Sequence, residues 1–402
     1  MPWREMSSMG QREEFVRLAG MVGANVSQLC RRFGVSRSNG YKWLGRYAAL
    51  GEAGLADASR RPKRSPARTS AAMEAEVLRI RDASNGAWGG RKIALVLARE
   101  GLETPSPSTV TEVLRRQGRL EARAREHPGP WRRFERAHPN ELWQMDYKGH
   151  FELSRGRCHP LTVLDDHSRY SLGLEACADE RDHTVRGRLT GIFRVYGLPL
   201  AMLADNGAPW GSTGAEAWTA FEVWLMRLGV RCGHSRPYHP QTQGKDERFH
   251  RTLKAEVLQG RTFGDLAQCQ SAFDAWRSIY NHQRPHEAIA MQTPALRYRP
   301  SSRPFPPALP PIEYGPGDQT RKVDDQGRIF FKSRRWRVGK AFRGLPIALR
   351  PTPEDGVFSL RFCAQVIGQI DPRQETSNMA RGLVDDAIAS TTTPPTPRPQ
   401  AN

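Results

Sequence analysis

The fold of this chain is decided by three stretches of sequence: LWQMD at 142–146, LADNG at 203–207 and YHPQTQGKDERFHRTLK at 238–254. The first two continue short apolar runs of the kind that form buried strands, and each contains an aspartate near the end of its run. In the third, Glu247 follows Gly244 at the start of a helical pattern. Side chains from two strand ends and a helix start can converge at one edge of a sheet. We therefore expect Asp146, Asp205 and Glu247 to lie close together.

Carboxylates that lie this close favour a divalent cation. They repel each other and resist ionising together, and a cation between them removes that penalty. Mg²⁺ takes oxygen ligands and keeps exchangeable waters, so the trio could hold two ions on either side of a scissile phosphate. One ion would activate an attacking water or 3′-hydroxyl, and the other would stabilise the leaving oxygen. In a chain with 42 acidic residues, spacing alone is weak evidence for such a site.

The residues around the three acids make the pattern more specific. In this order and with these neighbours, the stretches resemble the signature blocks of insertion-sequence transposases with a retroviral-integrase-like catalytic core. The resemblance covers about residues 140–300 and, less closely, two helical segments before them. It implies a DDE polynucleotidyl transferase with Asp146, Asp205 and Glu247 as both catalytic residues and metal ligands. It also implies two Mg²⁺ ions, with Mn²⁺ as a substitute.

One interval departs from this family pattern. Asp205 and Glu247 are 42 positions apart, which is somewhat longer than is typical, and the extra residues fall around 210–214. Adjacent Asp246 is a rival third ligand. The family pattern places the acid three residues after the glycine, and this favours Glu247.

The order of elements around these blocks predicts an α/β layer fold of the ribonuclease-H type. Three strands come first, then a helix, a short strand and further helices. The predicted strands cover 142–152, 161–164, 170–176, 200–204 and the vicinity of Val230, and the predicted helical regions include 184–196 and 244–282. We expect the integrase-like catalytic core to span 140–298.

A helix-turn-helix domain is predicted at 11–58. Ser36 follows the turn and is a good N-cap for a second helix over 37–47. In that helix Tyr41, Trp43, Leu44 and Tyr47 can pack inward. The residues left for contacts in a DNA major groove are Arg37, Ser38, Asn39, Lys42 and Arg46. The alternative is a plain helical hairpin with a solvated basic face.

Further basic residues are predicted to contact DNA. Residues 59–70 form a basic, proline-broken linker in which Arg61, Lys63 and Arg64 can follow phosphates. A second helix-turn-helix or winged-helix-like domain is expected over 71–120, with a linker at 121–139. On the helix of Glu247, Arg251 and Lys254 share a face with the acid and could grip a DNA end. An ordinary charged helix stripe is the alternative for these two.

The C-terminal part is predicted to be a separate small domain. A proline-rich linker covers 299–320, and short β-like runs over 321–372 suggest a small β-barrel. The tail at 373–402 is polar and is expected to be disordered. The predicted fold class is thus multidomain: all-α helix-turn-helix modules, a central α/β ribonuclease-H-like core and a small C-terminal β-barrel.

The charge of the chain points to a polyanionic partner. The formal net charge is +19 and the sequence pI is about 10.2, so double-stranded DNA is the leading partner. No run approaches the roughly 18 apolar residues of a membrane span, so no membrane partner is expected. No GxxxxGK[ST] loop is present, so no nucleotide cofactor is expected. The N-terminal residues 1–10 lack a signal-peptide core, which predicts the bacterial cytoplasm, in association with the nucleoid.

These expectations combine into one function. We predict a transposase that binds the terminal inverted repeats of an insertion sequence and catalyses metal-dependent DNA cleavage and strand transfer. At least a dimer is expected on DNA, because two ends must be held together. The alternatives are a catalytically silent DNA-binding regulator derived from a transposase and an endonuclease that cleaves without joining.

Overall fold

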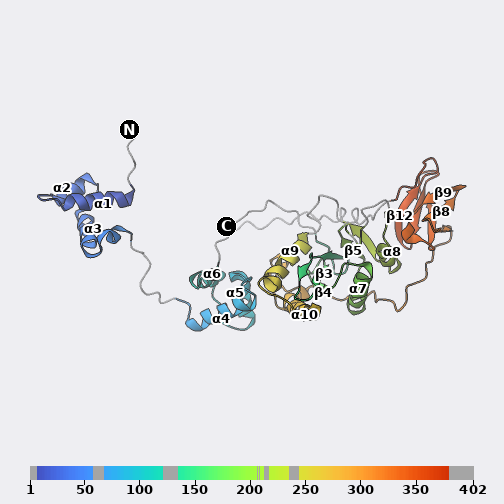
Figure 1. Cartoon of the computed structure of the whole chain (residues 1–402), viewed down its shortest axis with the longest axis horizontal. Coiled ribbons are helices and arrows are strands. Elements are labelled where there is room, and N and C mark those ends of the chain that lie inside the picture. The colour runs from blue at the N-terminus through green and yellow to red at the C-terminus, as the bar shows by residue number, and fades with distance from the viewer. Residues whose placement is uncertain are drawn as a thin grey trace. The chain divides into compact units, whose positions relative to one another are not determined.

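The computed structural model describes residues 7–57, 68–120, 135–205, 207, 209–211, 217–234 and 244–379. The chain forms two compact units, Met1–Arg68 and Thr69–Asn402. Each unit is described by itself, and Figure 1 labels the α-helices and some of the strands. In the described part of the chain, none of the helices is both long and apolar enough to cross a membrane.

The first unit contains a small bundle of helices. Its elements are α1 (Ser8–Ala19), α2 (Val26–Arg32), α3 (Arg37–Leu50) and a 3₁₀ turn (Gly51–Leu55). Ser36 caps α3 as expected, because its hydroxyl accepts a hydrogen bond from the Asn39 amide. Gly34 has a φ of 64°, which lets the chain turn sharply between α2 and α3.

The packing of α3 differs from the expectation. Gly40 is the buried residue of this helix, and a Cβ there would overlap the Cys30 sulfur. This close approach turns the Trp43 and Leu44 side of α3 toward the core. Tyr41 is 61% exposed and Tyr47 is 40% exposed, so the prediction that both tyrosines pack inward is wrong.

A second helical domain begins the other unit. It consists of α4 (Ala71–Ala83), α5 (Gly90–Arg99) and α6 (Pro107–Arg116), and its core includes Val77, Ile93, Leu97, Val110 and Leu114. Three helices were expected here, and three are found. The domain is docked on the catalytic core, because the Trp88 indole donates to the buried Glu256 carboxylate at 3.1 Å and Asn85 donates to the Ala255 carbonyl at 3.0 Å.

The central domain is built on a mixed sheet. Its strands are β1 (Leu142–Tyr147), β2 (Phe151–Glu152), β3 (Arg157–Asp165), β4 (Ser171–Cys177), β5 (Ala201–Ala204) and β6 (Arg231–His234). The order is β2-β3-β1-β5-β6, and β4 pairs with β3. β1 is antiparallel to β3 but parallel to β5, which is in turn parallel to β6.

Helices cover both faces of this sheet. They are α7 (Asp182–Tyr196), α8 (Ala220–Arg227), α9 (Gly244–Leu253), a π-helical segment (Lys254–Leu258) and α10 (Leu266–His282), followed by 3₁₀ turns at Glu287–Ile289 and Pro294–Leu296. Trp143 and Met145 of β1 pack in the cluster that contains residues of α7 and α8. Leu164 and Leu174 pack instead with Phe249 of α9 and with residues of α10. The expected α/β layer fold is therefore present, although 244–282 holds two helices instead of one long helical region.

The C-terminal strands form open sheets. β7 (Gln319–Lys322), β10 (Pro346–Pro351), β11 (Phe358–Phe362) and β12 (Gln365–Ile370) make a four-stranded sheet in the order β12-β11-β10-β7. β8 (Arg328–Phe331) and β9 (Arg334–Arg337) form a separate hairpin, followed by a 3₁₀ turn at Lys340–Phe342. Among the strands that the structure describes, no pairing closes a barrel, so the predicted barrel is replaced by this open arrangement.

The start of the proline-rich linker is hydrogen-bonded to the catalytic core and is not a free extended segment. Ser301 donates from its amide to the Tyr196 carbonyl at 2.8 Å and from its hydroxyl to the Leu198 carbonyl at 2.7 Å. The Arg303 guanidinium donates to the Gly229 carbonyl at 2.8 Å. The start of the predicted disordered tail is also ordered, because Asn378 pairs with Gln369 of β12. Residues 380–402 of that tail lie outside the described part.

Candidate catalytic site and its flanking residues

Asp146 and Asp205 are positioned by two neighbouring parallel strands. β1 and β5 pair with Leu142 opposite Ala201 and Gln144 opposite Leu203. Two residues further along the same register, Asp146 comes level with Asp205 at the carboxyl ends of the strands. This is the edge at which open α/β sheets bind their ligands.

The environment of Asp146 opposes its ionisation. Its side chain is 23% exposed. Burial raises the pKa of Asp146 to about 7, and the nearby Asp205 carboxylate adds to the rise. Glu180 and Glu247 contribute in the same direction with smaller effects. The site thus gathers negative charge in a partly desolvated place, which a cation would stabilise.

Two aromatic residues connect the aspartates. The Asp205 carboxylate oxygen Oδ1 accepts hydrogen bonds from the Gly207 amide at 2.9 Å and from the indole of Trp210. Trp210 is 2% exposed and stacks on Tyr147, with ring centroids 5.1 Å apart and an interplanar angle of 18°. Because Tyr147 directly follows Asp146, the stacked pair fixes the two strand ends against each other. Neither aromatic residue was predicted from the sequence to belong to the site.

A histidine supports the backbone of Asp205. His234, the last residue of β6, has Nδ1 2.6 Å from the Asp205 carbonyl oxygen and Nε2 2.7 Å from a carboxylate oxygen of Glu222. Glu222 is 1% exposed and also accepts from the Thr219 amide at 2.6 Å in the capping box of α8. The T-x-x-E spacing of Thr219 and Glu222 is a sequence signal for that cap. No comparable sequence pattern predicts the contact between His234 and the Asp205 carbonyl.

Glu247 lies on α9, which two polar contacts hold against the sheet. The Lys245 ammonium donates to the Asp166 carboxylate. His250 Nε2 is 2.9 Å from the Thr162 hydroxyl, and Thr162 is the β3 partner of Asp146. Burial lowers the pKa of His250 to about 4, so the ring is neutral near pH 7. Glu247 is exposed and lies three residues before His250, which places both on one side of the helix.

The adjacent Asp246 is buried, whereas Glu247 is exposed. Asp246 is 1% exposed, and its Oδ1 has no hydrogen-bond partner among the residues that the structure describes. Burial raises the pKa of Asp246 well above its ordinary value, and Asp146 and Asp166 add to the rise.

The structure thus brings the predicted trio together only in part. Asp146 and Asp205 are neighbours, and Glu247 is close enough to Asp146 to influence its charge. Within the described ranges, no three His, Cys, Asp or Glu side chains are close enough together to hold one metal ion. The segment 235–243, which leads into α9, lies outside those ranges.

The predicted DNA-binding residues occupy different settings. On α3, Arg37, Ser38, Asn39 and Lys42 are exposed. Arg46 instead lies over the Trp43 ring at 4.9 Å and donates to the Ala56 carbonyl at 2.7 Å. On the catalytic side, Arg251 and Lys254 are exposed, but α9 ends at Leu253. Arg61, Lys63 and Arg64 lie outside the described residues.

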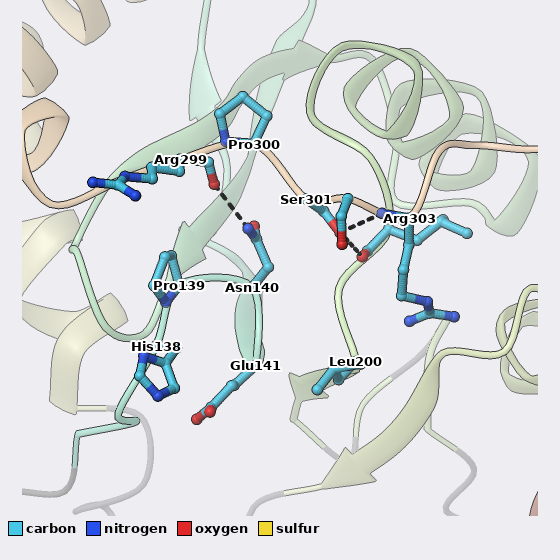
Figure 2. Close-up of a pocket in the computed structure, with 11 residues that line it drawn as sticks. His138, Pro139, Asn140, Glu141, Leu200, Arg299, Pro300, Ser301 and Arg303 are labelled. Atoms are coloured by element: carbon cyan, nitrogen blue, oxygen red, sulfur yellow. Dashed lines mark hydrogen bonds between the residues drawn. The ribbon is translucent and has the colours of Figure 1, made fainter.

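An open cleft occurs at the other end of the strands. Figure 2 shows it beside Asn140 and Leu200, which come just before β1 and β5. The Asn140 side chain donates to the Arg299 carbonyl at 2.8 Å across the cleft wall. Because Asp146 and Asp205 stand at the carboxyl ends of the same strands, this cleft is separate from the acidic site.

Family models match most parts of the chain. Integrase core domain models match residues 136–240 and 228–294. A helix-turn-helix domain model matches 11–63, and a homeodomain-like domain model matches 39–114. The C-terminal domain of IS481 family transposases matches 318–378.

Similar proteins include two from bacterial insertion elements. An uncharacterized 39.2 kDa protein of insertion element IS476 from Xanthomonas euvesicatoria is 29% identical over 164 residues, which are 39% of this chain and 44% of that protein. An uncharacterized 31.7 kDa protein of insertion element IS407 from Burkholderia multivorans is 25% identical over 217 residues, or 52% of this chain and 74% of that protein. The match therefore spans less than half of the first relative.

Solved structures with a similar chain include a viral intasome and a viral integrase core domain. The simian T-cell lymphotropic virus intasome with a PP2A regulatory subunit aligns at 17% identity and a TM-score of 0.35, over 71% of this chain and 95% of that chain. The HTLV-2 integrase catalytic core domain in complex with magnesium aligns at 16% identity and a TM-score of 0.31, over 40% of this chain and 99% of that chain.

The fold and the family matches define a helix-turn-helix protein with an integrase core. Joined to the C-terminal domain of IS481 family transposases, this is the domain composition of an insertion-sequence transposase. The resemblance expected from the three acidic stretches is confirmed.

Proposed function

We propose that this protein cuts DNA at the ends of an insertion sequence and joins them to a target by metal-dependent phosphoryl transfer. Asp146, Asp205 and Glu247 are its catalytic residues. The observation that carries the proposal is the shared register of β1 and β5, which brings Asp146 and Asp205 level at the ligand-binding edge of the sheet. The contact of His250 with Thr162, the β3 partner of Asp146, supports a place for Glu247 near that edge, and Lys245 anchors the start of α9 at Asp166, at the other end of β1.

The donor set fits Mg²⁺, or Mn²⁺ in its place. Asp146 and Asp205 offer hard carboxylate oxygens, and burial together with the repulsion from Asp205 raises the pKa of Asp146. Two bound ions would polarise the scissile phosphate and stabilise the attacking and leaving oxygens. The protein's own contribution is positioning: Trp210 occupies one oxygen of Asp205 with a hydrogen bond and so fixes the direction of the other.

The helical domains supply the DNA contacts in this proposal. The exposed residues at the start of α3 suit a major groove, and the terminal inverted repeats of the element are the expected sequence. Because two element ends react together, the protein would act as at least a dimer assembled on DNA. A DNA substrate would also place it with the nucleoid in the bacterial cytoplasm.

The first experiment is a strand-transfer assay on DNA that carries the gene's own flanks, with Mg²⁺ or Mn²⁺. The expected result is joined product from the wild type and none from Glu247→Gln, while both bind the DNA equally. Asp246→Asn is the matched control, because it changes the neighbouring acid, which is directed into the protein. It should fold and retain joining.

Two other outcomes would overturn parts of the proposal. Equal binding with neither cleavage nor joining in both metals would favour the DNA-binding regulator. Loss of joining in Asp246→Asn with retention in Glu247→Gln would assign the third ligand to Asp246.

A further inference from the structure

The hairpin β8–β9 is a two-stranded ribbon with one buried and one exposed face. Ile329 and Phe331 of β8 and Trp336 of β9 point into the core. The opposite side, here called the ribbon face, is exposed and consists of Arg328, Phe330, Arg335 and Arg337. Arg328 pairs across the strands with Arg337, and Phe330 pairs with Arg335.

This face combines two features that do not help the hairpin to fold. Arg328 and Arg337 are like charges at directly opposite positions, which destabilises a strand pair. Phe330 leaves 61% of its surface in water although it stands between arginines. Each feature by itself is common on protein surfaces. Their presence on neighbouring rungs of one short ribbon indicates a surface that is shaped for a partner.

The charge of the surrounding chain defines the kind of partner. Between residues 327 and 340 there are six lysine and arginine residues and no aspartate or glutamate. Arg334 lies on the other side of the ribbon, where its guanidinium donates to the Pro372 carbonyl at 3.1 Å and lies over the Trp336 ring at 4.8 Å. The ribbon face therefore presents positive charge around an apolar centre.

We propose that the ribbon face binds double-stranded DNA. A two-stranded β-ribbon fits the major groove of a duplex. Its arginines would contact phosphates on the groove walls, and Phe330 would enter the groove between them. The proposal goes beyond the catalytic function, because it assigns a duplex-binding surface to the C-terminal domain and does not depend on chemistry at Asp146.

Photocrosslinking tests the partner directly. The full-length protein would carry photoreactive benzoylphenylalanine in place of Phe330 and, in a matched control, in place of Leu296, a large apolar side chain that is 72% exposed in the catalytic domain. Mixed with duplex DNA of random sequence, the protein labelled at position 330 should crosslink to DNA, and the control should not. Crosslinking to a second copy of the chain, or no DNA adduct from position 330, would overturn the proposal.

Salt dependence tests the role of the arginines. Binding of the full-length protein to random duplex weakens with salt in proportion to the number of phosphate contacts. Arg328→Gln combined with Arg335→Gln should therefore reduce the slope of log K against log[salt] by about 2. The matched control is Arg343→Gln with Arg373→Gln, which removes the same charge from exposed arginines paired with Asp325 and Asp371. An unchanged slope in the ribbon variant, or an equal change in the control, would overturn the inference.

The strand-transfer assay keeps this proposal separate from the catalytic one. If the wild type binds random duplex through the ribbon face but joins no DNA, the catalytic proposal fails and the ribbon proposal stands. If joining is intact and the ribbon variant binds DNA as the wild type does, the ribbon proposal fails alone.

Discussion

Glu222 and His234 form a hydrogen-bonded pair in which a carboxylate oxygen lies 2.7 Å from Nε2 of the imidazole. The other ring nitrogen lies 2.6 Å from the Asp205 carbonyl oxygen, which can only accept, so Nδ1 donates to it. A buried carboxylate at the start of α8 therefore orients a ring that holds the backbone of a proposed metal ligand. His234 is a positioning residue in this arrangement.

We expect His234→Ala to reduce strand transfer by about 10- to 100-fold, the range found when groups that orient metal ligands are removed. The variant should need a higher Mn²⁺ concentration for half-maximal strand transfer and should bind Mn²⁺ more weakly in calorimetry. Its binding of terminal DNA should be unchanged. His234→Asn keeps a donor near the position of Nδ1 and should recover activity. His234→Gln places its amide toward Glu222 and should not. Equal activity of the two variants would contradict a role through Asp205.

The exposed tyrosine of α3 yields a second prediction. Tyr41 lies one helical turn after Ser38 and beside Lys42, and it is 61% exposed. Tyr41→Ala should weaken binding to the element's terminal DNA by about 1–3 kcal/mol, the value of a good base contact, with less effect on random duplex. Tyr47→Ala is the matched control on the same helix, and fluorescence anisotropy is the measurement. Equal losses from both substitutions would indicate a general loss of helix stability.

Local patterns predicted the strands, helices and caps well, because hydrophobic periodicity and capping residues act over a few positions. The apolar run before Asp205 and the Ser36 cap are examples. The inward packing of Tyr41 was wrong because the deciding contact is between Gly40 and Cys30, which belong to different helices. The close approach at Gly40 shifts the buried face, so that Trp43 and Leu44 face the core while Tyr41 and Tyr47 stay exposed.

The candidate site was predictable where it depended on strand ends. Asp146 and Asp205 are close because parallel neighbours align their carboxyl ends. The supporting residues Trp210 and His234 were missed, because their partners depend on the register of β5 and β6 and leave no periodic signal. The closed barrel was mispredicted for a similar reason, since short β-runs do not reveal which strands pair.

Glu256 should be important for stability. Its buried carboxylate accepts from the indoles of Trp88 and Trp276 and from the Arg284 guanidinium at 2.9 Å. Glu256→Ala leaves that arginine buried without its anion, which costs about 3–5 kcal/mol. Urea unfolding should show this loss, whereas Glu152→Ala, an exposed acid paired with Arg157, should cost less than about 1 kcal/mol. Because Trp88 belongs to the α4–α6 domain, limited proteolysis should also cut between α6 and β1 sooner in Glu256→Ala.

His286 should make the stability of the central domain depend on pH. It is 7% exposed and packs edge-on against Tyr280, and burial lowers its pKa to about 2, with Arg284 adding to the effect. The unfolded chain binds a proton at this residue near pH 6.5 and the folded chain does not, so stability is complete above pH 6.5 and falls as the pH decreases toward 2. Between pH 7.5 and 5 this residue should remove about 2 kcal/mol from the free energy of unfolding.

Urea unfolding across that range should show a smaller loss in His286→Gln than in the wild type. His183→Gln, a change on the exposed face of α7, is the control. Parallel pH curves for the wild type and His286→Gln would show that the ring accepts its proton in the folded state as readily as in the unfolded chain.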